Sequence, residues 1–475
     1  MIKHSRQQVR DPRAAYGPLR KAFGPGGPGG PGGPGGPGGP GGPGGPGGPG
    51  GPGGRRSGPA LAVWASLVVV AFAAGAVLHA LGLLPIDHLS PLHGHFRTPS
   101  VSLLPPLLLG VLAVAVLPAL TARLRFGAAL LVAYGTALAW TVLLAVSGEG
   151  LAHPFTSRYE YLAVLPAVGD DPLGWLASFT ERLPGYPTHV RGHPPLPVLV
   201  LWSLARVGLP GPFWAAVLVV VVGCSAVVAV ALTVRRLAGE ESARLALPCL
   251  ALSPAAVWIA TSMDAFFAGV GAWGVALLVC GGAGGRIRVL TGVAAGVSLG
   301  ALPYLSYGLV PYLLIPVVAA LAARISRATA VACLAGAAAV TAAFAAGGFL
   351  WPSGVLATHA EWAADPGAAR PYLYFLIANL AVLALLTGPA TAAGLVRMTS
   401  GGARALVAAA IVAVLALDVS GVTRGEVERI WLPYATWIVL AAAWAPRSPE
   451  APDRRWLAVQ ALTGLLLQGL VISPW

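Results

Sequence analysis

The chain has 475 residues, of which 56% are hydrophobic and 10% are charged, with a mean hydropathy of +0.75. Since roughly a quarter of the residues in a soluble domain are charged, this composition excludes an ordinary soluble protein. The formal net charge of +13 does not indicate nucleic-acid binding, because the basic residues stand in the N-terminal tail and between apolar runs, where they orient membrane helices.

Residues 1–59 hold a basic tail followed by a low-complexity tract. The tail covers residues 1–24, and residues 25–54 then repeat Pro-Gly-Gly. Glycine at every third position satisfies the collagen rule, but a triple helix needs three chains and richer intervening residues. We therefore expect a disordered cytoplasmic linker with a reach of about 30 Å by random-coil scaling, ending at Arg55 and Arg56 beside the first membrane span.

Apolar runs of about 20 residues predict transmembrane helices, about thirteen in all. Three lie within residues 60–147 and the others within residues 212–475. They are expected at 60–84, 101–121, 127–147, 212–234, 244–262, 265–283, 289–322, 328–350, 372–395, 404–420, 430–445 and 456–472. The stretch 289–322 is interrupted by Pro303, Tyr304 and Tyr307, which predicts two short helices with a polar hinge.

The positions of the arginines predict the orientation in the cell membrane. With the N-terminus in the cytoplasm, the arginine clusters all fall on the cytoplasmic side, as the positive-inside rule requires. These clusters are Arg123/Arg125, Arg235/Arg236/Arg244, Arg286/Arg288, Arg324/Arg327, Arg397/Arg404 and Arg447/Arg454/Arg455. The loop 148–211 is then extracytoplasmic, and its two apolar pieces, 172–183 and 196–207, are expected to be helices lying in the membrane interface.

This outer loop carries residues suited to group-transfer chemistry. Glu160 lies in Ser157-Arg-Tyr-Glu-Tyr161, and His193 lies in Arg191-Gly-His-Pro-Pro-Leu196. A carboxylate at the membrane surface can act as a general base, because partial desolvation raises its basicity, and Arg and His can hold phosphate oxygens. The alternatives are that Glu160 pairs with Arg158 and that His193 only caps the helix start.

The order of these motifs resembles the GT-C superfamily of integral-membrane glycosyltransferases, in its protein O-mannosyltransferase and aminoarabinose transferase branches. The likeness extends over roughly residues 150–445. It includes the turn Arg235-Arg-Leu-Ala-Gly-Glu240, Leu252-Ser-Pro254 followed by Ser262-Met-Asp264, and the stretch Arg424-Gly-Glu-Val-Glu-Arg-Ile-Trp-Leu-Pro-Tyr434. The chain departs from the pattern at Tyr159, where those branches commonly have a second acid, and in placing the loop after the third span rather than the first.

The resemblance implies a GT-C-like, all-α polytopic enzyme that takes a sugar from a polyprenyl-phosphate carrier. The acceptor would be a lipid, glycan or protein of the cell envelope. It further implies Glu160 and Asp264 as catalytic residues, and Arg191, His193 and Arg429 as phosphate-binding residues. Tyr304 and Tyr307, at the helix break, would line the lipid groove. The resemblance implies no organic cofactor and leaves a divalent metal open, because members of this superfamily differ in metal dependence.

Other interpretations remain open. Asp264 could cap the helix that begins at Ala265, and the cluster Arg424, Glu426, Glu428 and Arg429 could be an interface anchor with internal salt bridges. A transporter or lipid flippase would also have about a dozen spans and broken helices, and an inactive scaffold would explain Tyr159.

Metal sites and disulfides are not predicted. Asp87, His88, His93 and His95 stand close together in the sequence, but their spacing fits no compact helical pair of metal ligands. The four cysteines, Cys224, Cys249, Cys280 and Cys333, lie inside apolar runs without a CxxC pair, so structural packing is favoured. No metal-ligand set is therefore predicted.

Overall fold

The structure is a computed structural model that describes residues 57–84, 89–282, 284–398, 401–446 and 454–473. The predicted basic tail and Pro-Gly-Gly linker lie outside the described residues, as do Asp87 and His88 of the histidine-containing loop. The description below concerns the described part of residues 54–475, which forms one compact unit.

Nearly all of the described elements are helical. The α-helices are α1 Gly58–Ala80, α2 Leu104–Arg123, α3 Phe126–Ser147, α4 Leu165–Val168, α5 Pro172–Ala177, α6 Thr188–Arg191, α7 Leu196–Arg206, α8 Pro212–Ala251, α9 Ala256–Ile259, α10 Asp264–Cys280, α11 Gly285–Leu305, α12 Leu314–Ala323, α13 Arg327–Ala346, α14 Trp351–Ala364, α15 Tyr372–Thr387, α16 Pro389–Leu395, α17 Gly402–Val419, α18 Val427–Ile430, α19 Leu432–Ile438 and α20 Arg454–Leu470. The 3-10 helices are η1 Val101–Leu103, η2 His153–Thr156, η3 Tyr161–Val164, η4 Leu183–Gly185, η5 Tyr307–Leu309, η6 Pro311–Leu313, η7 Pro366–Ala369 and η8 Val439–Trp444. Two short strands, β1 His95–Phe96 and β2 Val471–Ile472, pair antiparallel.

The prediction of an all-helical membrane protein is confirmed. Within the described residues, seven helices are long and apolar enough to cross a membrane, or eight if the bent pair α15 and α16 forms one span. Large apolar side chains such as Val63, Val69 and Leu108 remain exposed on these helices, which water would disfavour and lipid would not. The number of thirteen spans stays a prediction.

Three helical stretches are broken at a residue whose backbone leaves the helical region, the first between two predicted spans and the other two inside a predicted span. α8 is interrupted at Gly239, where φ is 88° and ψ is 163°, inside the predicted turn 235–240. The predicted span 372–395 bends by 99° between α15 and α16, because Gly388 has a φ of 78° and is followed by Pro389. The break in 289–322 was placed correctly, but α11 continues through Pro303 and ends before Ser306.

Close packing of α11 against α13 depends on glycines spaced four residues apart. Gly292, Gly296 and Gly300 lie along the contact face of α11, and Gly336 of α13 faces them. A Cβ atom on Gly296 would meet the backbone oxygen of Cys333 at 1.9 Å. Small residues at such spacing let two membrane helices approach closely, so that van der Waals packing can hold them together.

We expect Gly296→Val to destabilise the protein by about 1–3 kcal/mol or more, as overpacking does in other cores, because α13 would have to move away. The loss would appear as a lower melting temperature of the purified protein in detergent. Gly135→Val on α3 is the control, since a Cβ atom there meets nothing within 4 Å. Equal melting temperatures for the two variants would contradict the role of the close contact.

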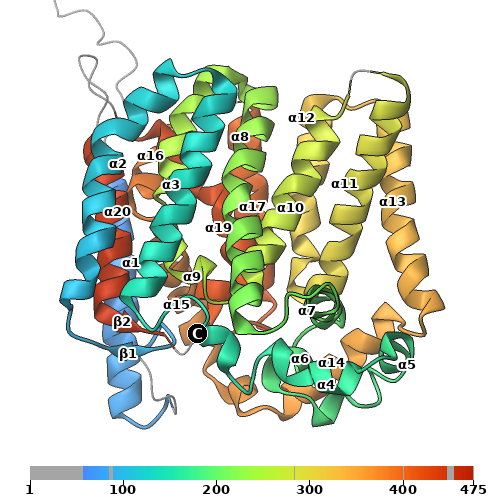
Figure 1. The fold of residues 1–475 in the computed structure, drawn as a ribbon. Helices are drawn as coiled ribbons and strands as arrows, with labels where there is room; N and C mark the ends of the chain where they lie inside the picture. The colour runs from blue at the N-terminus through green and yellow to red at the C-terminus, as the bar shows by residue number, and fades with distance from the viewer. Residues whose placement is uncertain (1–56, 85–88, 283, 399–400, 447–453, 474–475) are drawn as a thin grey trace, which may run out of the picture. The chain divides into compact units, whose positions relative to one another are not determined.

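The two ends of the helices differ in character. At one end lie the short helices α4, α5, α6, α7 and α14 (Figure 1); α5 and α7 occupy the two apolar pieces predicted to be helical. At the opposite end of α3, Arg235 and Arg244 lie over the ring of Phe126. Thus the loops predicted to be extracytoplasmic meet at one end, here called the loop end, and arginines predicted to be cytoplasmic meet at the other, here called the basic end.

Candidate active site

Glu160 and His189 form a buried pair at the loop end. Glu160 stands directly before η3, and its Oε1 atom lies 2.7 Å from Nδ1 of His189 on α6. Only 2% of Glu160 and 7% of His189 are exposed. Among the described residues, the second oxygen of Glu160, Oε2, has no hydrogen-bond partner. A buried oxygen of this kind is costly to leave unpaired, so it is suited to accept a proton from a bound group.

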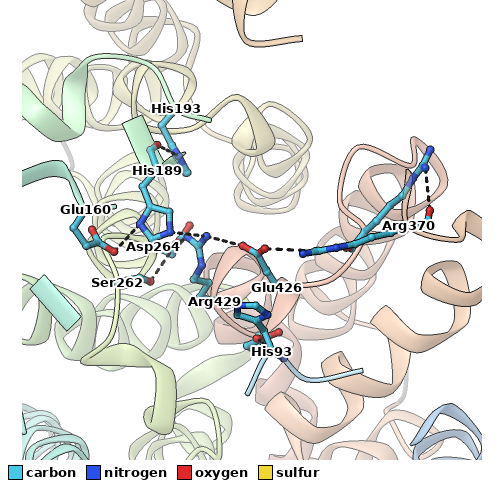
Figure 2. A network of polar contacts seen from close by, with 11 residues as sticks. His93, Glu160, His189, His193, Ser262, Asp264, Arg370, Glu426 and Arg429 are labelled. Atoms are coloured by element: carbon cyan, nitrogen blue, oxygen red, sulfur yellow. Dashed lines mark hydrogen bonds and ion pairs between the residues drawn. The ribbon is translucent and has the colours of Figure 1, made fainter. Parts of the chain in front are cut away.

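Arg429 connects this pair to two further carboxylates. Its guanidinium nitrogens lie 3.3 Å from Nε2 of His189, 3.4 Å from Oδ2 of Asp264 and 3.0 Å from Oε2 of Glu426. Figure 2 shows the resulting chain of contacts from Glu160 through His189 and Arg429 to Glu426. We call Glu160, His189, Asp264, Glu426 and Arg429 the charge network. Its members come from the 148–211 loop, the start of α10 and the segment before α19.

Opposite charges hold Glu426 and Arg429 in their ionised forms. Burial opposes ionisation of Glu426, but the positive charges of Arg429, His93 and Arg370 outweigh it and lower the pKa of this carboxyl to about 2. Burial likewise disfavours the Arg429 cation, yet Glu426, Asp264 and Glu160 together raise the pKa of the guanidinium above its ordinary value. The centre of the network is therefore a permanent cation among carboxylates.

Glu426 is also the member of the network most open to solvent. Its side chain is 25% exposed, compared with 5% for Arg429, and it makes a second ion pair with Arg370 at 3.5 Å. The backbone of Glu426 has a φ of 60°, a left-handed conformation that residues with a side chain rarely adopt and that recurs at functional sites.

His193 and Tyr161 border the network on the side of Glu160. Nδ1 of His193 bonds the backbone oxygen of His189 at 2.8 Å, and the His193 ring lies edge-on to Tyr161, with ring centres 5.7 Å apart. Burial lowers the pKa of His193 to about 4, so this ring is neutral at pH 7. Burial, together with the charges of Asp264 and Glu160, raises the pKa of Tyr161, which keeps its hydroxyl protonated.

The structure brings Glu160, Asp264, His193 and Arg429 together, but it places the other predicted site residues elsewhere. Arg191 forms an ion pair with Glu361 of α14 at 3.2 Å, which ties the outer loop to that helix. Tyr304 stacks on Phe344 of α13, with ring centres 4.2 Å apart. Tyr307 packs against Trp351 of α14. The two tyrosines thus belong to an aromatic layer between α11, α13 and α14.

Glu160 does not pair with Arg158, and Asp264 does not cap α10, which were the simpler alternatives for these two acids. Arg158 donates to the hydroxyl of Tyr159 and lies over its ring, while Glu160 points into the protein toward His189. Asp264 is the first residue of α10 rather than its cap, which is Met263, and Oδ2 of Asp264 accepts from Ser262 at 3.1 Å.

The charged segment 424–429 is divided between two environments. Arg424 donates to the backbone oxygens of Gly421, Ala368 and Arg370, and its guanidinium lies near the rings of Trp362 and Tyr372, as an interface anchor would. Arg429 and Glu426 instead form the buried network. The segment therefore separates Arg424, which contacts backbone oxygens of neighbouring loops, from Glu426 and Arg429, which contact each other inside the protein.

Glu428 lies beside the network and contacts the first outer loop. Its Oε1 atom accepts from the backbone N–H of His93 at 3.1 Å, and its side chain is fully buried. Burial, reinforced by the negative charge of Glu426, raises the pKa of this carboxyl to about 7 from an ordinary value of 4.5. Glu428 can therefore change charge near neutral pH.

We expect this shift to make stability depend on pH. Between about pH 4.5 and 7 the folded protein keeps a proton that the unfolded chain has lost, so stability falls as the pH rises through this window, by about 3 kcal/mol for a shift of this size. Glu428→Gln should have the same melting temperature as wild type near pH 5 and a higher one above pH 7. The measurement is the melting temperature in detergent from pH 4.5 to 8. The exposed Glu149→Gln is the control, and identical pH profiles for all three proteins would contradict the prediction.

Some members of the site were not singled out from the sequence. His189 bridges Glu160 and Arg429, and the available signal was its spacing of four residues from His193, which places two histidines close together at a helical turn. The sequence indicates Ser262 only as part of the motif Ser262-Met-Asp264. Arg370 was not predicted as a site residue, and its contacts with Glu426 and with the backbone oxygen of Arg424 could not be read from the sequence.

A metal site is not formed by the described residues. No group of three or more His, Cys, Asp and Glu side chains in that part of the chain is arranged to hold a metal ion.

Comparisons of the chain with protein-family models, with curated proteins and with solved structures find no match.

Proposed function

We propose that this protein is a polytopic membrane glycosyltransferase that moves a sugar from a polyprenyl-phosphate carrier to an acceptor of the cell envelope. On this proposal the charge network is the active site, and the loop end faces the outside of the cytoplasmic membrane. Two things support the proposal: the resemblance in motif order to the GT-C superfamily, and the geometry of Glu160, Asp264 and Arg429.

The observation that carries the proposal is the meeting of a proton acceptor and an anion binder in one buried network. Glu160 offers an unpaired carboxylate oxygen. His189 lies between Glu160 and Arg429 and contacts both of them. A base and a phosphate-holding cation are the two protein groups that sugar transfer from a lipid phosphate requires. Both lie at the loop end of the helices.

The residues would act in the following way. The acceptor hydroxyl donates a hydrogen bond to Oε2 of Glu160 and gives up its proton as its oxygen attacks the anomeric carbon of the sugar. The bond from that carbon to the phosphate oxygen breaks, and its electron pair leaves with the polyprenyl phosphate. Arg429 stabilises the departing phosphate, while His189 orients the Glu160 carboxylate through Oε1. Asp264 fixes the guanidinium of Arg429.

Binding of the donor requires an exchange of partners at Arg429. Its guanidinium contacts His189, Asp264 and Glu426, of which Glu426 is the most exposed. A phosphate oxygen would take the place of the Glu426 carboxylate, which can remain paired with Arg370. The network would thus open on its solvent side when the donor binds and close when polyprenyl phosphate leaves.

The experiment that tests the function is transfer of radiolabelled sugar in membranes that contain the protein. A panel of polyprenyl-phosphate hexoses and pentoses serves as donors, and membranes without the protein serve as the control. We expect the protein to place label from at least one donor into a lipid, glycan or protein fraction. A lack of transfer across the whole panel, with the protein present in normal amounts, would overturn the proposal.

A transporter or lipid flippase is the second candidate, and the bend of 99° between α15 and α16 is the observation that favours it. Transporters use such interrupted helices around a central substrate site. The same donor panel in sealed vesicles separates the two functions. Movement of the lipid-linked sugar across the bilayer without any transfer to an acceptor would favour the flippase.

A further inference from the structure

The basic end contains a cavity that the proposed active site does not use. Its volume is about 630 Å³, within the range of small-molecule sites, which measure roughly 300–1,000 Å³. It lies where the ends of α10 and α12 meet the starts of α11 and α13, beside the turn in α8. Asp264 begins α10 and Cys280 ends it, so the cavity and the charge network are separated by about 24 Å of helix.

The charge of the cavity wall is entirely positive. Four arginines line it, Arg235, Arg236, Arg288 and Arg324, and none of the described lining residues is acidic. Arg235 has its carboxylate partner, Glu240, outside this lining. The positive-inside rule explains arginines at this end of the helices, but it does not require that they surround a common hollow.

Hydrogen-bonding groups accompany these cations. Ser326 and Thr329, at the start of the 20-residue helix α13, line the same cavity. The first turn of α13 contains no acidic residue, so the positive end of its dipole is not neutralised by a side chain of its own. Arg324 adopts a left-handed backbone, with a φ of 50°, a position at which glycine would be easier to accommodate.

We propose that this cavity binds a phosphate group, carried either by an anionic lipid headgroup or by a soluble phosphate compound. Arginines from several segments around a hollow give charge-assisted, fork-shaped hydrogen bonds to phosphate oxygens. Basic pockets between membrane helices hold anionic headgroups in the same manner. The inference rests on the cavity alone and is independent of the proposed transferase activity.

Cys280 provides a direct measure of occupancy, because its thiol lines the cavity and is exposed. Cys224 and Cys249 are buried, and Cys333 is partly buried, so a Cys333→Ala background leaves Cys280 as the reactive thiol. The rate of alkylation by N-ethylmaleimide is measured for the full chain in phosphatidylcholine nanodiscs. Inorganic phosphate is added in one arm, and phosphatidylglycerol replaces part of the lipid in the other. We expect slower alkylation in at least one arm.

Two sets of variants separate the cavity from the general charge of this end. Arg236→Gln combined with Arg324→Gly should weaken binding of the protecting ligand roughly tenfold or more, since the double variant removes two charge-assisted contacts. Glycine suits the left-handed backbone at position 324. Arg327→Gln removes a charge at the start of α13 outside the cavity lining and should retain protection, as should Glu160→Gln.

The arms also identify the source of the phosphate. Protection by phosphatidylglycerol alone assigns a lipid headgroup, and protection by inorganic phosphate assigns a soluble compound. Lack of protection in both arms would overturn the proposal. An equal loss of protection in the double variant and in Arg327→Gln would also overturn it, because binding would then depend on the overall charge and not on the cavity.

Discussion

Replacing Glu160 by glutamine is expected, on the proposed function, to reduce sugar transfer by about 10²- to 10⁴-fold, the usual contribution of a general base. The amide keeps the size of the side chain and can still hydrogen-bond His189, but it cannot take a proton from the acceptor hydroxyl. Because the buried pair with His189 keeps its shape, the abundance and melting temperature of the variant should stay close to wild type. The measurement is transfer of radiolabelled sugar from the active donor, at matched protein amounts.

Glu149→Gln is the matched control for this experiment. Glu149 lies near the start of the same outer loop, but its side chain is 51% exposed and pairs with His153. Its replacement should leave transfer within about twofold of wild type, since exposed ion pairs contribute little. If Glu160→Gln retained full transfer, the base would have to be another acid, with Asp264 tested next. If both variants lost activity equally, the effect would belong to the loop and not to one carboxylate.

The helices could be predicted from the sequence because hydrophobic length is a local property. Apolar runs mark where the chain can lie in lipid, and most of the predicted spans coincide with helices. Whether an apolar run forms one straight helix or two helices with a bend between them is harder to predict from its hydrophobicity. Gly388-Pro389 stands inside one predicted span, and its glycine and proline were the available signal for a turn, but the run remained apolar enough to be taken as a single helix.

The members of the site could be proposed one by one, but their contacts could not. Glu160 was proposed because a carboxylate at the membrane surface can act as a base, and Asp264 and Arg429 were proposed from the resemblance in motif order. That Arg429 lies between the other two depends on how α10 packs against the segment before α19, which no spacing in the sequence encodes. The separation of Arg191 from the network has the same origin, since its partner Glu361 belongs to a distant helix.

Replacing Arg429 by glutamine is expected to destabilise the protein by about 3–5 kcal/mol, the usual cost of removing one partner from a buried ion pair. The guanidinium is 5% exposed and lies among Asp264, Glu426 and His189. Without it, two carboxylates lose their common cation in a site that water reaches poorly. The measurement is the melting temperature in detergent. Arg429→Lys should recover only part of the loss, because a single ammonium cannot contact all three partners in the geometry of a guanidinium.

A double variant distinguishes a coupled network from a general defect at Arg429. Asp264→Asn removes one of the carboxylates that Arg429 neutralises, so Asp264→Asn combined with Arg429→Gln should cost less than the sum of the two single changes. Arg206→Gln is the control, since its ion pair with Asp170 is exposed at 57% and 88% for the two side chains and should contribute at most about 1 kcal/mol. Strict additivity of the two buried changes would show that Asp264 and Arg429 stabilise the fold separately. In that case the charge network could not act as one site.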